Sequence, residues 1–199
     1  MSTSLIDLRN ISRQSSDDFS GLQTNLAQLI GEPFRFIRVS YGEELTIHFG
    51  DLRPARSPKL HKQLYGAFIL GFRGSPWIIK VGSEPLILTA GICLDSVSAK
   101  FGKPISKEEL ESKQFIVPES RVLSAVPFIV KPVNTYGLQF RLSDGTSLLV
   151  LPTVSEPDEP EDESLPESAD WELLSPLGLL SVGPELTWSF EPAVESRKQ

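Results

Sequence analysis

The sequence predicts an α+β protein in which two similar units pack into one pseudo-symmetric domain covering residues 1–199. Each unit would be a helix followed by a small antiparallel β-meander. Two patterns predict this fold: apolar residues at helical spacing early in the chain, and alternation of apolar and polar residues through both halves. A length of 199 residues and a hydrophobic content of 40% allow a substantial core.

The first predicted element is an amphipathic helix at residues 15–31. The segment begins with Ser and Asp residues, which favour a helix start, and it ends at Gly31, which favours a stop. Its apolar positions recur at the spacing of one helix face: Phe19, Leu22, Leu26, Leu29 and Ile30.

The period then changes to two, which predicts strands at residues 34–40 and 44–50 joined by a turn at Tyr41 and Gly42. Alternation places Phe34 and Phe36 on one face of the first strand, and Arg38 is a further candidate for that face. His48 alternates with the apolar residues of the second strand, so we expect its ring to face solvent or a partner rather than to bind a metal.

Further segments continue the predicted fold, and they include strands at residues 115–120 and 122–133. Short apolar runs divided by Gly, Ser and Pro predict a meander at residues 65–91, and a Ser-x-x-Glu capping box predicts a second helix at 106–113. Residues 136–152 alternate around an Asp-Gly pair, which is a strong hairpin signal.

Residues 171–190 predict another hairpin or pair of strands. The three tryptophans lie in strand-like runs and are expected in the core: Trp77, Trp171 and Trp188.

An internal repeat is suggested by the order of features in the two halves. Asp51 to Trp77 spans 26 positions and Asp144 to Trp171 spans 27. The alternative is a coincidence of ordinary hairpin sequences.

The repeat places residues 15–90 in the first unit and residues 91–153 with 170–190 in the second. Residues 155–169 are rich in Pro and carboxylates, which predicts an acidic flexible loop, and residues 191–199 are expected to form a tail.

Charge is distributed unevenly in a chain of formal net charge -7. Residues 1–141 hold 17 basic and 13 acidic side chains, whereas residues 142–199 hold 2 and 13. A basic loop in the first half therefore stands out, and it is the predicted partner-binding site: Arg53, Arg56, Lys59, His61 and Lys62.

Such a loop attracts anions. Three partners are open: an acidic face of another protein, a nucleic-acid backbone, or the acidic loop of this chain. The alternative is a solvated loop that has no partner. The net charge and the lack of an interleaved aromatic platform beyond Tyr65 and Phe68 make nucleic acid the less favoured choice.

The sequence predicts no catalytic residue, no metal site and no cofactor. It has a single cysteine, two histidines and none of the spacings that mark zinc sites, phosphate loops or nucleophile elbows. No apolar run is long enough to cross a bilayer and no signal peptide is recognisable, so a cytoplasmic location is expected.

The second half resembles a family of small uncharacterised bacterial proteins with repeated apolar-x-Phe hairpins closed by Asp-Gly, and with a C-terminal Trp-Glu-Leu, Pro-x-Gly, Val-Gly-Pro and Trp signature. The matching residues are Leu138, Phe140, Asp144-Gly145, Trp171-Glu-Leu and the run "SPLGLLSVGPELTW". The resemblance implies a non-catalytic protein-interaction or accessory module of a bacterial system, such as an immunity-type factor. The acidic segment before Trp171 and the basic loop before Tyr65 depart from the family pattern.

Two other hypotheses stay open from the sequence. A nucleic-acid-handling enzyme or DNA-binding accessory subunit would use Asp51, Glu84 and Lys80, because carboxylates holding a cation beside a lysine can activate water. A structural homodimer would form by pairing of exposed sheet edges.

Overall fold

The computed structural model describes residues 17–39, 45–55, 62–72, 77–81, 86–90, 119–130, 134–152 and 170–193. Within these residues the protein is mainly β, with one α-helix, α1 (Asp17–Leu26), which continues into a 3-10 turn, η2 (Ala27–Leu29). No helix in the described part of the chain is long and apolar enough to span a membrane.

The strands form two antiparallel sheets and a short hairpin. The six-stranded sheet has the order β1 (Phe34–Val39), β2 (Leu45–Phe49), β5 (Phe68–Phe72), β11 (Trp171–Ser175), β12 (Gly178–Val182) and β13 (Trp188–Pro192). The five-stranded sheet has the order β7 (Leu86–Ala90), β6 (Trp77–Val81), β10 (Ser147–Pro152), β9 (Thr135–Leu142) and β8 (Val122–Val130). The hairpin pairs β3 (Arg53–Pro54) with β4 (Leu64–Tyr65).

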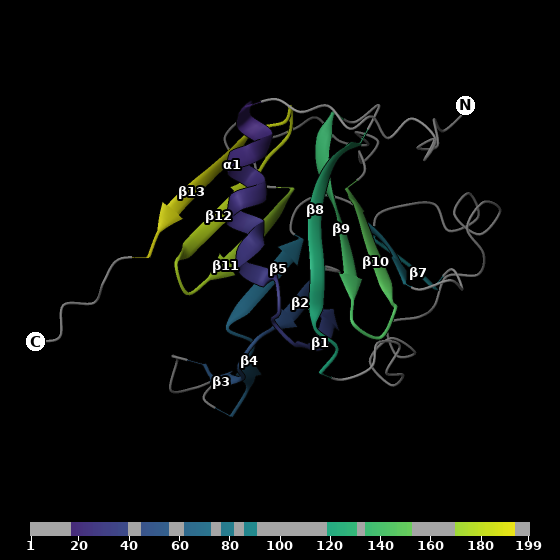
Figure 1. Ribbon diagram of the computed structural model, residues 1–199, viewed down its shortest axis with the longest axis vertical. Helices are drawn as coiled ribbons and strands as arrows, with labels where there is room; N and C mark the ends of the chain where they lie inside the picture. The colour runs from purple at the N-terminus through teal and green to yellow at the C-terminus, as the bar shows by residue number, and fades with distance from the viewer. Residues whose placement is uncertain are drawn as a thin grey trace, which may run out of the picture.

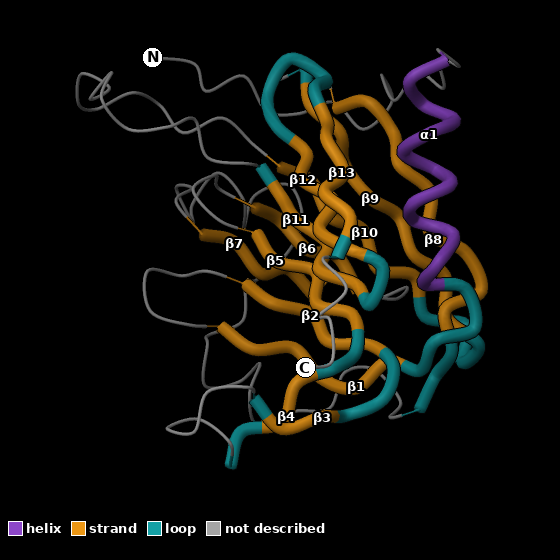
Figure 2. The backbone as a smooth tube through the Cα atoms, turned by 90° about the vertical axis from the view of Figure 1, so that its left-hand side faces the viewer, coloured by secondary structure: helices purple, strands orange, loops and turns teal. Residues whose placement is uncertain are grey.

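The two sheets pack over one hydrophobic core, and the helix covers the open side between them. Figure 1 shows α1 between β12 and β13 on one side and β8 on the other, and Figure 2 shows the same helix along the margin of the molecule. The helix and the 3-10 turn bury Leu22, Leu26 and Leu29 completely. Across the core, the rings of Phe49 in β2 and Phe140 in β9 lie 5.7 Å apart.

A backbone joint links the two sheets at one corner. The joint consists of residues 31–34, which lead into β1, and residues 119–122, which lead into β8. Its hydrogen bonds run from Gly31 N–H to the Val122 carbonyl (2.8 Å), from Val122 N–H to the Glu32 carbonyl (3.0 Å) and from Phe34 N–H to the Ser120 carbonyl (2.7 Å).

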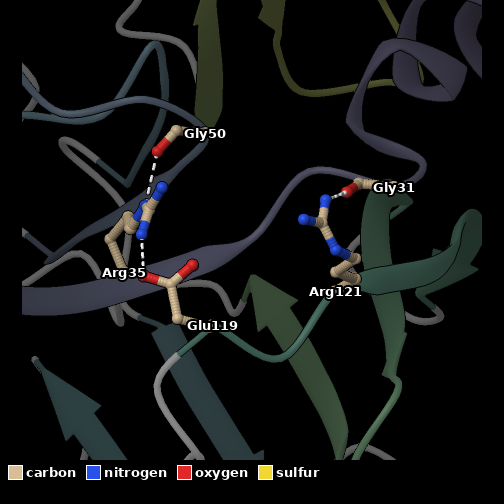
Figure 3. Close-up of polar contacts among 5 residues, drawn as sticks. All are labelled: Gly31, Arg35, Gly50, Glu119 and Arg121. Atoms are coloured by element: carbon tan, nitrogen blue, oxygen red, sulfur yellow. Dashed lines mark hydrogen bonds and ion pairs between the residues drawn. The ribbon is translucent and has the colours of Figure 1, made fainter.

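Two arginines reinforce this joint (Figure 3). Arg35 donates to the carbonyl of Gly50 at 2.6 Å and pairs with the carboxylate of Glu119. Arg121 donates to the carbonyl of Gly31 at 2.7 Å. Both guanidiniums therefore bridge chain segments that are far apart in the sequence.

The predicted α+β class and the internal repeat are wrong. In the repeat, residues 15–90 and the later residues would form separate sheets, but β5 pairs with β11 and β6 pairs with β10. Each large sheet therefore mixes strands from both halves of the chain. Sequence similarity between the halves reflects the turn and alternation pattern that any antiparallel hairpin needs. The predicted helix at 106–113 lies outside the described residues.

Several local predictions are confirmed. The helix forms as expected, although Ile30 lies 48% exposed instead of in the core. The Asp-Gly hairpin joins β9 and β10: Gly145 has a φ of +88°, and the Asp144 carboxylate accepts a hydrogen bond from the Thr146 N–H at 2.9 Å. Residues 171–190 form three strands rather than two.

One face assignment in the first strand is wrong because of a β-bulge. The register with β2 pairs Phe34 with Phe49 and then Phe36 with His48, so one extra residue, Arg35, stands between the two phenylalanines. Phe34 points into the core, whereas Phe36 lies on the opposite face of the sheet. A strict period of two cannot reveal such an inserted residue.

Replacing Leu26 by Ala should lower the free energy of unfolding by about 2–5 kcal/mol, because the cavity would open in the core under the helix. Denaturant titration followed by circular dichroism measures the change. Gln23→Ala on the exposed face of the same helix is the control and should alter stability by less than about 0.5 kcal/mol. Equal effects of the two substitutions would mean that the helix does not pack as described.

Candidate groove on the outer face of the six-stranded sheet

The outer face of the six-stranded sheet carries two rows of side chains, each crossing all six strands. Directly paired residues of an antiparallel sheet share a face, so the register defines the rows. The apolar row is Phe36, His48, Ile69, Leu174 and Leu179, and it ends at Glu191. The polar row is Arg38, Thr46, Gly71, Glu172, Ser181 and Ser189.

An open groove of about 830 Å³ lies over the part of the apolar row that runs from β5 to β13. Its floor includes Ile69, Leu174 and Leu179. The β3–β4 hairpin forms one wall, and the β11–β12 turn with the end of β13 forms the other. Arg53 and Glu191 both line the groove, so its two walls carry opposite charges.

Close packing of the hairpin against β2 depends on Gly66, which follows β4. A Cβ atom at this position would lie 2.4 Å from the Phe49 carbonyl oxygen, so any larger residue would push the hairpin away. The Gly66 N–H also donates to Nδ1 of His48 at 3.2 Å. The hairpin wall is therefore tied to β2, next to the groove.

The prediction that His48 faces solvent or a partner is wrong. Its ring is on the outer face, as alternation requires, but the residue is only 1% exposed. Phe36 stacks on it with ring centres 4.3 Å apart, and the Tyr65 ring lies 5.7 Å away. Side chains of β1 and β4 cover a position that the sequence of β2 alone marks as exposed.

Hydrogen bonds fix the tautomer of His48. Because Nδ1 accepts from Gly66, the ring proton resides on Nε2, which donates to the Thr46 hydroxyl at 3.2 Å. That hydroxyl donates in turn to the Arg38 carbonyl at 3.3 Å. Burial, and secondarily the positive charge of Arg38, lower the pKa of His48 from 6.5 to about 4. The ring is neutral at physiological pH.

Arg38 is the last member of this network, and it lies on the outer face of the sheet. Its guanidinium carbon lies 5.4 Å from the centre of the Phe36 ring and 5.3 Å from that of Tyr65, which are cation–π distances. Tyr65 also lines the groove. Arg38 itself does not line the groove, but its charged end is held next to the lining residue Tyr65.

Two of the predicted basic-loop residues belong to the described structure. Arg53 lines the groove, and Lys62 is exposed just before β4. Neither side chain has an ion pair within the described residues. Arg56, Lys59 and His61 lie outside the described residues.

The alternative catalytic set is not brought together in the described part of the chain. Asp51 is exposed after β2 of the six-stranded sheet and does not line the groove, whereas Lys80 belongs to β6 of the other sheet. Glu84 lies outside the described residues. Among the residues that the structure describes, no group of three or more His, Cys, Asp or Glu side chains is placed to hold a metal ion.

The core role predicted for the tryptophans is confirmed for Trp171, which is fully buried and donates from Nε1 to the Tyr136 carbonyl at 2.6 Å. Trp188 is partly buried and packs against the core. The side chain of Trp77 lies outside the described part of the structure.

Sequence reasoning missed Phe36, Arg38 and Tyr65 as site residues. The residues stand in short strands, and only the bulge in β1 and the folding of the hairpin over β2 bring them together. The one available signal was the basic character of the loop before Tyr65. Comparisons with protein families, with curated proteins and with solved structures find no match to this chain.

His48 should make stability depend on pH. Since its pKa is lower in the folded protein than the ordinary 6.5, the unfolded chain binds the proton more readily at intermediate pH. The contribution of neutral His48 to the free energy of unfolding should be complete above about pH 6.5. It should be lost as pH falls towards 4, by at most about 3 kcal/mol.

His48→Asn tests this, because an amide oxygen can still accept from the Gly66 N–H but cannot titrate. The difference in unfolding free energy between the natural protein and the variant, measured from pH 4 to 8, should narrow at low pH. The carboxylates contribute equally to the pH dependence of both proteins, so their effect cancels in this difference. A difference that stays constant over this range would refute a buried neutral histidine.

Proposed function

We propose that the protein is a non-catalytic binding module that holds an acidic, partly apolar segment of another protein in the groove beside the β3–β4 hairpin. The observation that carries this proposal is the position of Arg53, a cation without an ion pair in the described structure, in the lining of a groove with an apolar floor. An aliphatic floor with few placed charges is typical of protein-recognition sites.

The apolar component of the proposed contact comes from β11 and the β11–β12 turn. Leu174 is 49% exposed in the groove floor and Leu177 is 62% exposed in the adjoining turn. Large aliphatic side chains gathered at a groove gain free energy when a partner removes them from water. The exposure of these two leucines therefore supports a protein ligand, which would bury them, over a small polar ligand.

The charge on the same face supports an acidic protein over nucleic acid. Arg53 and Lys62 lie on the hairpin, but Glu172 and Glu191 lie farther along the sheet, and Glu191 lines the groove. A phosphate backbone crossing the groove would be repelled by these carboxylates. A protein segment with an acidic residue near Arg53 and a basic or neutral one near Glu191 would suit both walls.

The bacterial accessory or immunity-type role is the part of this proposal that rests on the resemblance of residues 133–190 to the small bacterial family. A cytoplasmic location belongs to the same proposal. The partner itself would be a protein of the same cell that presents the acidic segment.

Selection of random linear peptides displayed on phage tests the groove directly, because the library offers it many combinations of charged and aliphatic residues. The natural protein should enrich peptides that contain Asp or Glu beside aliphatic residues. The selected peptides should bind Arg53→Glu about tenfold or more weakly, because the substitution places like charges together. Binding would be measured by isothermal calorimetry.

Arg141→Glu is the matched control, since Arg141 is an exposed arginine on β9 of the other sheet. This variant should bind the selected peptides as the natural protein does. Selection that enriches no sequence, or peptides that bind the two variants equally, would reject the groove as the binding surface.

A further inference from the structure

Arg38 is held by contacts both to its backbone and to its guanidinium. At its base, the Arg38 carbonyl accepts from the Thr46 hydroxyl and the residue pairs with Thr46 across β1 and β2. At its head, the guanidinium lies over the Phe36 and Tyr65 rings. An arginine usually loses much side-chain freedom when it binds a ligand, and here much of that loss has already occurred in the free protein.

The two rings are themselves fixed by contacts behind them. Phe36 stacks on His48, and the Tyr65 hydroxyl donates to the side-chain oxygen of Gln63 at 2.8 Å. His48 is held by hydrogen bonds to the Gly66 N–H and to Thr46. The support therefore extends from the sheet through a buried ring to the guanidinium.

Nothing in the described structure uses the donors of this guanidinium. Arg38 forms no side-chain hydrogen bond and no ion pair among the described residues. By contrast, Arg35 near the start of β1 and Arg121 just before β8 both donate to backbone carbonyls. An arginine carries five N–H donors in a planar fork that matches two oxygens of one carboxylate.

We propose that Arg38 is the receptor for a single carboxylate of the ligand, at the edge of the groove next to Tyr65. This inference rests on the groove being the binding surface proposed above. It assigns the anchoring charge to a residue outside the basic loop. Arg53, which pairs with Tyr65 in the hairpin, would contact the ligand within the groove, and Arg38 would fix the position of the ligand.

The charges around Arg38 favour a carboxylate over a phosphate group. Arg38 is the only cation in the apolar and polar rows, and the other charged members of these rows are Glu172 and Glu191. Phosphate groups carry nearly two negative charges at neutral pH and are typically bound by clusters of basic residues. One cation matches one carboxylate.

Nuclear magnetic resonance of the arginine Nε–Hε groups tests the assignment with small anions. Acetate is titrated into the intact chain at constant ionic strength, and inorganic phosphate is titrated in a parallel experiment. The Arg38 signal, identified by its loss in Arg38→Met, should shift and saturate with acetate. The signal of Arg141 should show no saturable shift.

Two variants distinguish recognition from packing. Arg38→Met keeps an apolar stem over the rings and should retain the spectrum of the folded protein. Arg38→Lys keeps the charge without the planar fork and should bind acetate about tenfold more weakly, as followed by the backbone amide of residue 38.

Saturation of Arg38 by phosphate but not by acetate would overturn the carboxylate assignment, and saturation by neither anion would overturn the site. Either of these titration results would leave the proposal that the groove binds a peptide untouched. Peptide selection that depends on Arg53 would support the groove even if Arg38 bound no anion, and saturation by acetate would support the receptor even if selection failed.

Discussion

Backbone pairing between residues 31–34 and 119–122 is the constraint on which the rest of the structure depends. It joins β1 of one sheet to the start of β8 in the other, and Arg35 and Arg121 strengthen it from both sides. Since the helix ends immediately before this pairing, the joint also sets where α1 lies. Leu22, Leu26 and Leu29 then fill the open side between the sheets, and one core results.

The same joint has a consequence on the outer face. Phe34 is held in the core by pairing with Phe49 and by its hydrogen bond to residue 120, while β1 must still pair with β2 along its length. The bulge at Arg35 reconciles the two demands, and it places Phe36 and Arg38 on the outer face. The aromatic support under Arg38 therefore derives from how the two sheets are joined.

The groove combines elements that have different physical roles. The sheet supplies a flat apolar floor, the β3–β4 hairpin supplies a wall held close by Gly66, and His48 fills the space between them. A charged imidazole here would place a second cation next to Arg38 in a buried position, and burial keeps the ring neutral instead. Within this network of Phe36, His48 and Tyr65, the positive charge therefore lies on Arg38 alone.

The sequence by itself determined the features that depend on neighbouring residues: the helix with its buried leucines, the hairpin at Asp144 and Gly145, and the uneven distribution of charge. It did not determine the pairing of β5 with β11 or of β6 with β10, because hairpin patterns specify local partners and leave the outer edges of each hairpin undefined. Tertiary structure alone decided the bulge in β1, the burial of His48 and the position of Arg38 over two rings. The physical reason is that each of these results from contacts between strands or hairpins whose relative placement is set by the shared core and the joint, and not by the period of any one segment.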